Sequence, residues 1–536
     1  MASIHPLTLR CVLLASIIAA GAQSAAAQAT SPSSSKPETK SAAKARAAAA
    51  RAARAEATLV APLVQAEALS LRDVVARLRE TNRSILSKQA EAAITATGIE
   101  RAESAFQPQL NIAALRGVTT QKRTFEEALL QSDRGIYRRE GNDVSVGVST
   151  VVPATGAKLE VKSALSRFLT NQPDPQRPSD DAAYNRSTLG FSLTQPLARD
   201  AGAEVTQARV NMARLDTVAA DHASRDTEIS VVAEAILAYH ELVFAQQRVS
   251  AAQEKINTST RLLGEAQALR RLGRLAQTEV WEVENALARY RSALSEAIQN
   301  QRERSNRLRA MLMMDPSPTL FRAVDELPAV ETTPVDATES LRIALSKRDD
   351  YLMRKTQAER EGIQLVYAKN QKLPRIDLVA SYGLSGLEFS GRQALEWQRM
   401  QNYPAWTLGV QVNVPLGANK QADADLQAAL LRREDALLAV KALETQIAVD
   451  IDTSAALLTS MTERWTLWRE VATREGEQLA AERVKFNAGR SDTRELLLRQ
   501  ERVINARLSV QEQQVGYARA RTLLQAAQGL LMERLP

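Results

Sequence analysis

A long stretch without proline constrains this chain more than any other feature. Residues 417–535 contain no proline, and between Ala418 and Phe486 the only glycine is Gly476. Wide or apolar side chains recur there at alternating steps of four and three residues, over about six heptads. They are Leu426, Leu430, Arg433, Leu437, Val440, Glu444, Ile447, Ile451, Ser454, Leu458, Met461, Trp465 and Trp468. The pattern predicts a coiled-coil helix over 418–487, about 105 Å long for a rise of ~1.5 Å per residue.

The residues after this helix predict a reversal of the chain. Gly489 is a stop signal, and Asp492 followed by Glu495 is a capping pair that begins a new helix. The second helix runs to about Leu531. We therefore expect an antiparallel helical hairpin over 418–532.

A second hairpin is expected over 200–314, because residues 202–314 are also free of proline. Its turn repeats the first: a Gly-Arg pair is followed by a glutamate that opens the return helix, 216 residues earlier in both cases. The matching residues are Gly273, Arg274 and Glu279 in one hairpin and Gly489, Arg490 and Glu495 in the other. The chain is thus internally duplicated.

The N-terminal residues have the composition of a targeting segment and a spacer. Arg10, the apolar run 11–20 and the small residues near Ala27 predict a secretory signal peptide over 1–29. Cleavage there would leave no cysteine, since Cys11 is the only one. Residues 30–69 are a low-complexity Ala/Lys/Arg segment, which predicts a solvated tether, with a basic contact to a membrane surface as the alternative.

Both halves of the duplication have the same order of elements: a short helix, a proline, strands, a second proline and the long hairpin. The first repeat covers 70–314, with strands within 110–197. The second covers 337–532, with strands within 376–414. The proline-containing residues 315–336 join the two repeats as a linker.

Alternating apolar and polar residues predict six strands. The runs are 110–118, 144–152, 158–168 and 187–197 in the first repeat, and 376–383 and 406–414 in the second. Runs of about ten residues, joined by short turns on one side and long loops on the other, are typical of a transmembrane β-barrel wall. The aromatic residues between Tyr382 and Trp406 could form an interfacial belt or anchor the loop.

Catalysis and nucleic-acid binding find little support in the sequence. Outside the predicted signal peptide the histidines are His222 and His240, about 27 Å apart on one helix at ~1.5 Å per residue, so they cannot share a metal. No nucleophile set, phosphate loop or cofactor motif is present. The net charge of +7 is spread over 536 residues without a basic stripe, which argues against nucleic acid. We expect no enzyme, no cofactor and no metal.

The ordered set of duplication, strands, Gln195-Pro196-Leu197 strand exit and glycine-centred tips resembles the TolC-like outer membrane efflux proteins, from about 70 to 532. The resemblance implies a mainly α fold with a transmembrane β-barrel. It implies a homotrimer whose subunits share one barrel, in contact with outer membrane lipid, and one periplasmic α-helical tunnel. The implied function is an exit duct of tripartite efflux or type I secretion in a Gram-negative cell, with a periplasmic adaptor (membrane fusion) protein and an inner membrane RND or ABC pump. The alternative is a soluble periplasmic coiled-coil scaffold.

The resemblance also assigns roles to the tips. Gly273-Arg274 and Gly489-Arg490 would contact the adaptor, and Glu279, Glu495 and Phe486 would lie at the periplasmic gate. The chain departs from the family where Leu498 replaces a second acid and where Phe486 lacks the hydroxyl that holds some closed gates. The other interpretation of the two glutamates is capping of the return helices, typically ~0.3–1 kcal/mol each.

The first repeat has 47 more residues between its two prolines than the second. The family pattern implies four strands per subunit and twelve per trimer. The two further runs predict six per subunit and eighteen per trimer. The alternative is that residues 144–168 form a hairpin folded over the barrel mouth.

Overall fold

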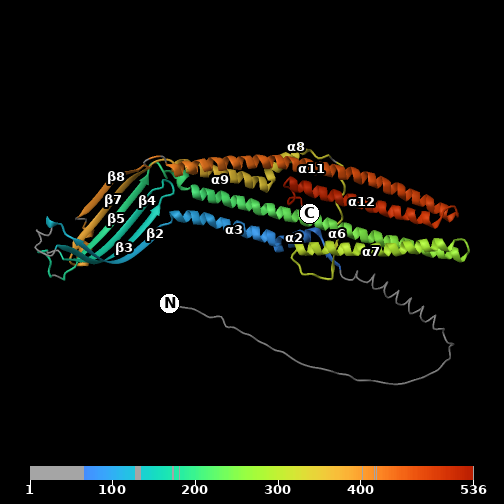
Figure 1. The fold of residues 1–536 in the computed structure, drawn as a ribbon, viewed down its shortest axis with the longest axis horizontal. Coiled ribbons are helices and arrows are strands. Elements are labelled where there is room, and N and C mark those ends of the chain that lie inside the picture. The colour runs from blue at the N-terminus through green and yellow to red at the C-terminus, as the bar shows by residue number, and fades with distance from the viewer. Residues whose placement is uncertain are drawn as a thin grey trace, which may run out of the picture. The chain divides into compact units, whose positions relative to one another are not determined.

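A computed structural model describes most of the chain beyond the N-terminal segment (Figure 1). The described residues are 66–126, 135–171, 174–179, 181–332, 334–400, 403–415, 417 and 419–534. The predicted signal peptide, and the tether up to residue 65, lie outside them and stay predictions. No helix in the described ranges combines the length and the apolar character needed to cross a membrane.

Two long helical hairpins dominate the fold. The first consists of α6 (Ala208–Arg271) and α7 (Gln277–Met311), and the second of α11 (Lys420–Asn487) and α12 (Thr493–Ala527). Figure 1 shows both hairpins ending at the same end of the molecule. The fold is therefore mainly helical, and the heptad-patterned stretch is one unbroken helix.

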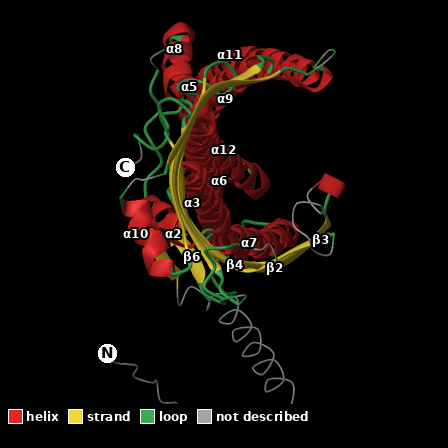
Figure 2. Cartoon of the chain, turned by 90° about the vertical axis from the view of Figure 1, so that its left-hand side faces the viewer, coloured by secondary structure: helices red, strands yellow, loops and turns green. Residues whose placement is uncertain are grey.

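Two shorter helices complete the helical layer. On the side of the strands, α3 (Arg83–Glu103) packs on α6, α6 on α9 (Asp349–Gln371), and α9 on α11. Towards the turns the neighbours become α7, α6, α12 and α11. In the described part of the chain, four helices thus lie side by side at either level. Figure 2 shows that they follow an open arc.

The large sheet lies at the end opposite the hairpin turns (Figure 1). Its strands are β2 (Gln109–Lys122), β3 (Ile136–Val151), β4 (Lys158–Thr170), β5 (Tyr184–Pro196), β7 (Arg375–Glu388) and β8 (Pro404–Asn413). Among the described residues they pair in the order β2-β3-β4-β5-β7-β8, and every pair is antiparallel. The 144–168 region therefore lies inside the sheet, and the alternative of a separate hairpin over the mouth does not describe this chain.

One chain does not close a barrel. The edge strands β2 and β8 have no pairing to each other in the described residues, and the sheet curves as an open arc (Figure 2). The single chain thus has a curved, open sheet, and the transmembrane β-barrel stays a prediction. Each free edge presents a row of unpaired backbone N–H and C=O groups, with which a further strand can pair.

The main apolar core lies at mid-length, where the linker crosses the helices. β1 (Ala66–Leu69) pairs in parallel with β6 (Leu320–Ala323), and Leu69 and Phe321 are fully buried against Tyr239 and Leu308. Residues 66–69, predicted as the end of the tether, form β1 in the structure, and Leu69 packs in this core.

Smaller elements cap and connect these parts. They are α2 (Leu71–Thr81), the 3-10 turn η2 (Ser104–Phe106), α5 (Ala203–Thr206), α8 (Ala337–Lys347) and α10 (Gly391–Arg399). Ser70 and Asp73 form a capping box that starts α2. The linker residues 315–319 are held by Arg309, which donates to the carbonyl oxygens of Ser317 and Thr319 at 3.2 and 2.8 Å.

Candidate functional site: the two faces of the sheet and the hairpin tips

The register of the large sheet sorts its side chains by polarity. One row of directly paired residues crosses all the strands named above: Leu110, Val148, Val161, Phe191, Tyr382 and Trp406. Every member is apolar or aromatic, and each is 41% to 74% exposed. Paired residues point to the same face of a sheet, so this row is a continuous apolar band.

The neighbouring row points to the opposite face and is polar throughout. It consists of Gln109, Ser149, Glu160, Ser192, Ser381 and Thr407. An exposed apolar face backed by a polar face is the pattern of a wall between lipid and water. In a water-soluble sheet the apolar face would be covered by other elements of the fold.

The helix α10 identifies the apolar face as the convex one. Ser187 donates a hydrogen bond of 2.6 Å to the carbonyl oxygen of Ala394, and a Cβ at Gly386 would meet that same oxygen at 2.1 Å. Both residues share the face of the apolar row, since Ser187 pairs with Gly386 and with Leu165. Figure 2 shows α10 outside the curve of the sheet. The polar row therefore lines the concave side.

The aromatic side chains between Tyr382 and Trp406 differ in their surroundings. Trp397 of α10 packs on Tyr403 with ring centroids 6.3 Å apart, which anchors the loop between β7 and β8. Trp406 is 74% exposed in the apolar row of the edge strand β8. One tryptophan is thus a loop anchor, and the other has the exposure of an interfacial residue.

The tips are built on two equivalent glycines. Gly273 and Gly489 have φ of 72° and 69°, in the left-handed region that ends helices and that other residues rarely adopt. Arg274 and Arg490 follow them, exposed, with their backbone N–H groups bonded to the carbonyl oxygens of Leu269 and Lys485. The tips therefore present a guanidinium at the same place in each hairpin.

The two tip glutamates have different partners. Glu279 lies in the first turn of α7 and accepts hydrogen bonds from Thr493 of α12, from the hydroxyl at 2.9 Å and from the backbone N–H at 3.4 Å. Glu495 instead accepts from Arg499 of its own helix at 2.9 Å, and its backbone N–H donates to the capping Asp492 at 2.7 Å. Glu279 thus ties the two hairpins together, and Glu495 stabilises one of them.

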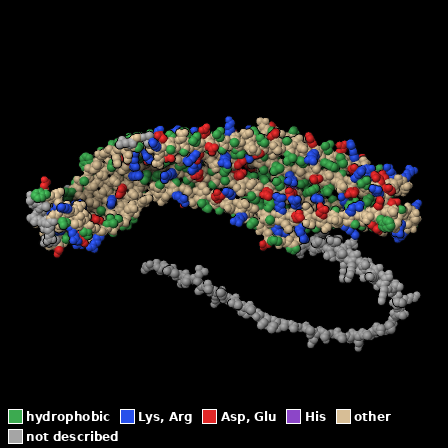
Figure 3. Space-filling view, in the orientation of Figure 1, with side chains coloured by type: hydrophobic (Ala, Val, Ile, Leu, Met, Phe, Trp, Pro, Cys, Tyr) green, Lys and Arg blue, Asp and Glu red, His purple; other side chains and the backbone are tan. Residues whose placement is uncertain are grey.

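Phe486 belongs to an apolar cluster between the two tips. The buried members are Leu262, Val283, Ala286, Tyr290, Leu496 and Leu497, and Phe486 packs against them with Ile256, Leu263 and Leu479. A hydroxyl is not needed for this contact, because the ring joins the hairpins by packing. Figure 3 shows charged side chains of both signs interspersed along the hairpins outside such contacts.

Several tip residues were not identified from the sequence. Thr493 is fully buried beside Glu279, and Glu482 accepts hydrogen bonds from Ser491 and, at 3.3 Å, from Lys485. Tyr290 donates to Glu501 at 3.3 Å, and burial together with this carboxylate raises the pKa of Tyr290 to about 12. A hydroxyl in the first turn of a helix gives only a capping signal, so its partner in the other hairpin could not be found from spacing.

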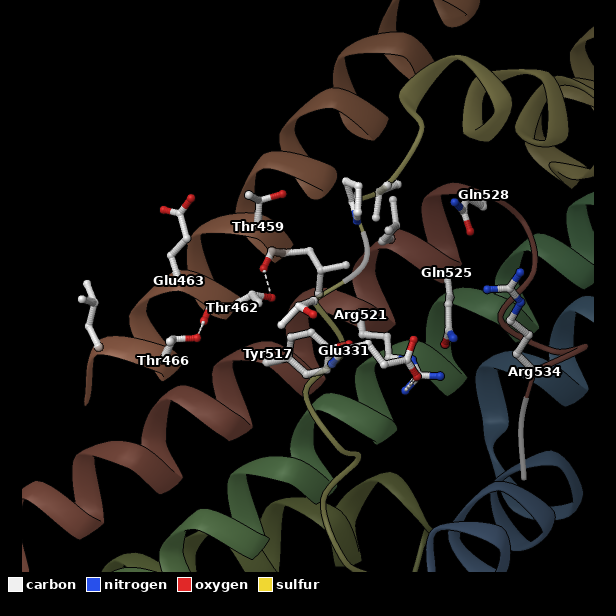
Figure 4. A pocket seen from close by; sticks show the side chains of 16 residues that line it. Glu331, Thr459, Thr462, Glu463, Thr466, Tyr517, Arg521, Gln525, Gln528 and Arg534 are labelled. Atoms are coloured by element: carbon white, nitrogen blue, oxygen red, sulfur yellow. Dashed lines mark hydrogen bonds and ion pairs between the residues drawn. The ribbon is translucent and has the colours of Figure 1, made fainter. Parts of the chain in front are cut away.

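A cavity of about 750 Å³ lies where the linker passes α11 and α12. Figure 4 shows Tyr517 and Arg521 directed towards Glu331 of the linker. The Tyr517 hydroxyl accepts a hydrogen bond of 3.2 Å from the backbone N–H of Glu331, and the Arg521 guanidinium lies 3.8 Å from the Glu331 carboxylate.

The two histidines of α6 have different surroundings. The His222 ring forms a hydrogen bond of 2.7 Å with the Asp349 carboxylate, whereas burial lowers the pKa of His240 to about 4. In the described ranges no cluster of side chains is suited to a metal ion.

Comparison of the sequence found no matching family model, and no curated protein matches it either. Comparison of the structure did find similar proteins. A membrane protein of Pseudomonas aeruginosa is similar with a TM-score of 0.59 and 16% identity, over 86% of this chain and 93% of that one. The outer membrane protein VceC of Vibrio cholerae gives a TM-score of 0.57 and 15% identity, over 86% and 96%.

A third structure is the open state of the MtrE outer membrane channel of Neisseria gonorrhoeae, with a TM-score of 0.57 and 15% identity over 86% and 89% of the two chains. These likenesses extend over the sheet and both hairpins together, since they cover most of either chain. The sheet and the paired hairpins thus follow a known architecture: this chain has the fold of the TolC-like outer membrane channels.

Proposed function

We propose that this protein is the outer membrane exit duct of a tripartite efflux or type I secretion system in a Gram-negative bacterium. Cargo would be delivered by a periplasmic adaptor and an inner membrane RND or ABC pump, and would leave passively through the duct. The observation that carries the proposal is the pair of register rows, apolar on the convex face and polar on the concave face of one sheet.

Closure of the duct follows from the two free edges. Strands alternate in direction along the sheet, so β2 and β8 run in opposite directions. The β8 edge of one copy can then pair with the β2 edge of the next, and the antiparallel order continues around a ring. Open edges are not tolerated in lipid, which is why we propose a closed homotrimer with every backbone group paired.

The helical layer would continue the ring as a tunnel below the membrane. Its tips would then be the entrance, where Gly273-Arg274 and Gly489-Arg490 contact the adaptor. Glu279, Glu495 and Phe486 would belong to the gate, with the Glu279–Thr493 bond and the Phe486 cluster holding the tips together. Glu495→Gln should reduce the preference of the closed channel for cations in single-channel recordings. An unchanged preference would remove Glu495 from the gate.

The soluble scaffold is the weaker alternative. It would explain the hairpins, yet it would leave side chains such as Trp406, Leu408 and Ile112, 65% to 74% exposed, in water on one continuous face. Large exposed apolar faces on soluble proteins mark a contact surface or lead to aggregation. A channel in lipid uses this face, and a scaffold does not.

The test is cellular fractionation combined with an edge crosslink. The only cysteine is Cys11 in the predicted signal peptide, so introduced cysteines would be the only thiols of the mature chain. Ile112→Cys on β2 is combined in turn with cysteine at Leu408, Val410 or Val412 on β8. We expect an outer membrane protein that migrates as a trimer until heated, and crosslinks between different subunits in at least one pair. Recovery in the soluble periplasmic fraction would overturn the proposal.

A further inference from the structure

The sheet holds two strands that the duplication does not require. β5 corresponds to β8, since each leads into the long first helix of its hairpin, and β2 corresponds to β7, since each follows the short-helix proline. β3 and β4 have no counterpart among the described residues of the second repeat. The additional residues of the first repeat thus form these two strands.

Both additional strands are fully integrated into the wall. β3 pairs with β2 from Ile136 to Ser149, and with β4 from Arg139 to Val151. Val144, Val146 and Val148 lie on the apolar face at 42% to 48% exposure. The connection between β3 and β4 is short, and it closes with the N–H of Val152 bonded to the carbonyl oxygen of Ala157 at 2.8 Å. The hairpin therefore continues the apolar row, in which Val148 and Val161 lie between Leu110 and Phe191.

The width of the sheet matches the width of the helical layer above the tips. Four neighbouring helices, at about 9 Å between axes, cover an arc of about 36 Å. Six strands spaced by about 4.8 Å and tilted by about 40° to the barrel axis cover about 38 Å. Without β3 and β4 the same estimate is about 25 Å. The additional hairpin thus brings the wall to the width of the helices.

The additional hairpin also brings charge to the concave face. Lys158, Glu160 and Lys162 follow one another at alternate positions of β4, all exposed. Their direct partners on β5 are Thr194, Ser192 and Gly190. The neighbouring strand is thus uncharged at these positions, and β4 supplies a net positive charge to the polar face.

We propose that β3 and β4 widen the channel, so that the trimer closes a barrel of eighteen strands instead of twelve, with a ring of β4 charges inside it. The inference rests on the proposed trimeric duct and deepens it. The circumference of the barrel is about 1.5-fold that of the twelve-stranded barrel, since it grows in proportion to the number of strands. The barrel is then no narrower than the tunnel, and selection of cargo by size occurs at the tips.

The test is a cysteine scan of β3 in intact outer membranes with a water-soluble thiol reagent. We expect Val144→Cys, Val146→Cys and Val148→Cys to be protected by lipid, and Ser145→Cys and Ser149→Cys to be labelled through the lumen. Val410→Cys and Thr407→Cys on β8 are the matched pair, protected and labelled in a barrel of either size. Equal labelling of all β3 positions, with the β8 pair still sorted, would overturn the inference alone. Loss of sorting on β8 as well would overturn the proposed membrane wall.

A deletion variant measures the width directly. Joining Lys122 to Tyr184 by a short glycine-containing turn removes β3 and β4 and keeps β2 antiparallel to β5. Electron cryomicroscopy of trimers in detergent should show an intact barrel of about 1.5-fold the circumference of the deleted one. Equal circumferences would contradict the inference. If the deletion variant does not assemble, the strand count in the intact trimer decides: eighteen supports the inference and twelve refutes it.

Discussion

The long helices of the two repeats are similar in length, whereas the numbers of strands differ. α7 and α12 are both 35 residues long, and α6 and α11 have 64 and 68 residues. The strands number four in the first repeat and two in the second, within the described residues. A change in helix length would move one tip away from the other, whereas a whole β-hairpin can enter a sheet without reversing the direction of any other strand.

The tips show a second difference between the repeats, in the roles of equivalent residues. α12 begins with Asp492, whose side chain caps the helix, and the equivalent position of α7 is Ala276, which makes no such bond. Glu279 reaches Thr493 of the other hairpin, whereas Glu495 stays on its own helix. The two hairpins are thus complementary at this contact: the first supplies the acceptor and the second the donor.

The largest effect is expected from a charge in the apolar row. Val161→Arg in the first repeat and Tyr382→Arg in the second should each cost about 2–4 kcal/mol per subunit if the residue lies at the middle of the bilayer. Both should abolish the heat-sensitive trimer in gel electrophoresis. Ser192→Arg on the polar face is the matched control and should assemble. Assembly of Val161→Arg together with failure of Tyr382→Arg would show that the two repeats do not form one wall.

The next effect is expected from the bond between the hairpins. Thr493→Val keeps the shape of the side chain and removes the hydroxyl donor to Glu279, a charge-assisted bond of about 1.5–3 kcal/mol. The tips should open more often, which single-channel conductance would show as longer open times. Thr493→Ser restores the donor and should restore closure. Unchanged gating in the valine variant would mean that the bond does not hold the tips.

A smaller effect is expected from the tip glycines. Gly489→Val must adopt a left-handed conformation, at a cost of about 1–2 kcal/mol. Gly476→Val is the matched control inside α11, where neither a positive φ nor a close contact opposes the side chain. We expect the Gly489 variant to form trimers that no longer export, and the same result for Gly273→Val. Loss of export in only one of the two glycine variants would show that the adaptor distinguishes the two hairpins.

The smallest effect concerns His240 of the first repeat. The residue 216 positions further along the chain, in the second repeat, is Ala456. Because burial lowers the pKa of His240 from 6.5 to about 4, the folded protein holds this ring neutral. The stability that the neutral ring contributes is present above pH 6.5, the pKa of a free imidazole, and is lost as the pH falls towards 4. Between pH 7 and pH 6 the free energy of unfolding should fall by less than about 1 kcal/mol per subunit. His240→Leu should flatten the pH dependence of thermal unfolding over this range. An unchanged slope would show that other groups cause it.

The local features of both repeats were open to prediction from sequence. The seven-residue period from Leu426 to Trp468 specifies one helix whatever it packs against, because the spacing itself places the wide residues on one side. Gly489 ends the first helix by its left-handed backbone conformation, and Asp492 starts the second by accepting a hydrogen bond from the backbone N–H of Glu495, three residues further on. The six alternating runs could also be located in the sequence, and each lies within an observed strand to within a residue or two.

Pairing between distant segments was decided only by the tertiary structure. Alternation in 144–168 cannot tell a wall strand from a strand over the mouth, since both expose one face; its pairing with β2 and β5 does. Leu69 looked like part of a tether until β6, more than 250 residues away, gave it a partner and a core. Glu279 and Thr493 are 214 residues apart, and no periodicity connects them. Such contacts depend on how whole elements pack, and packing is a property of surfaces that the chain forms only once it is folded.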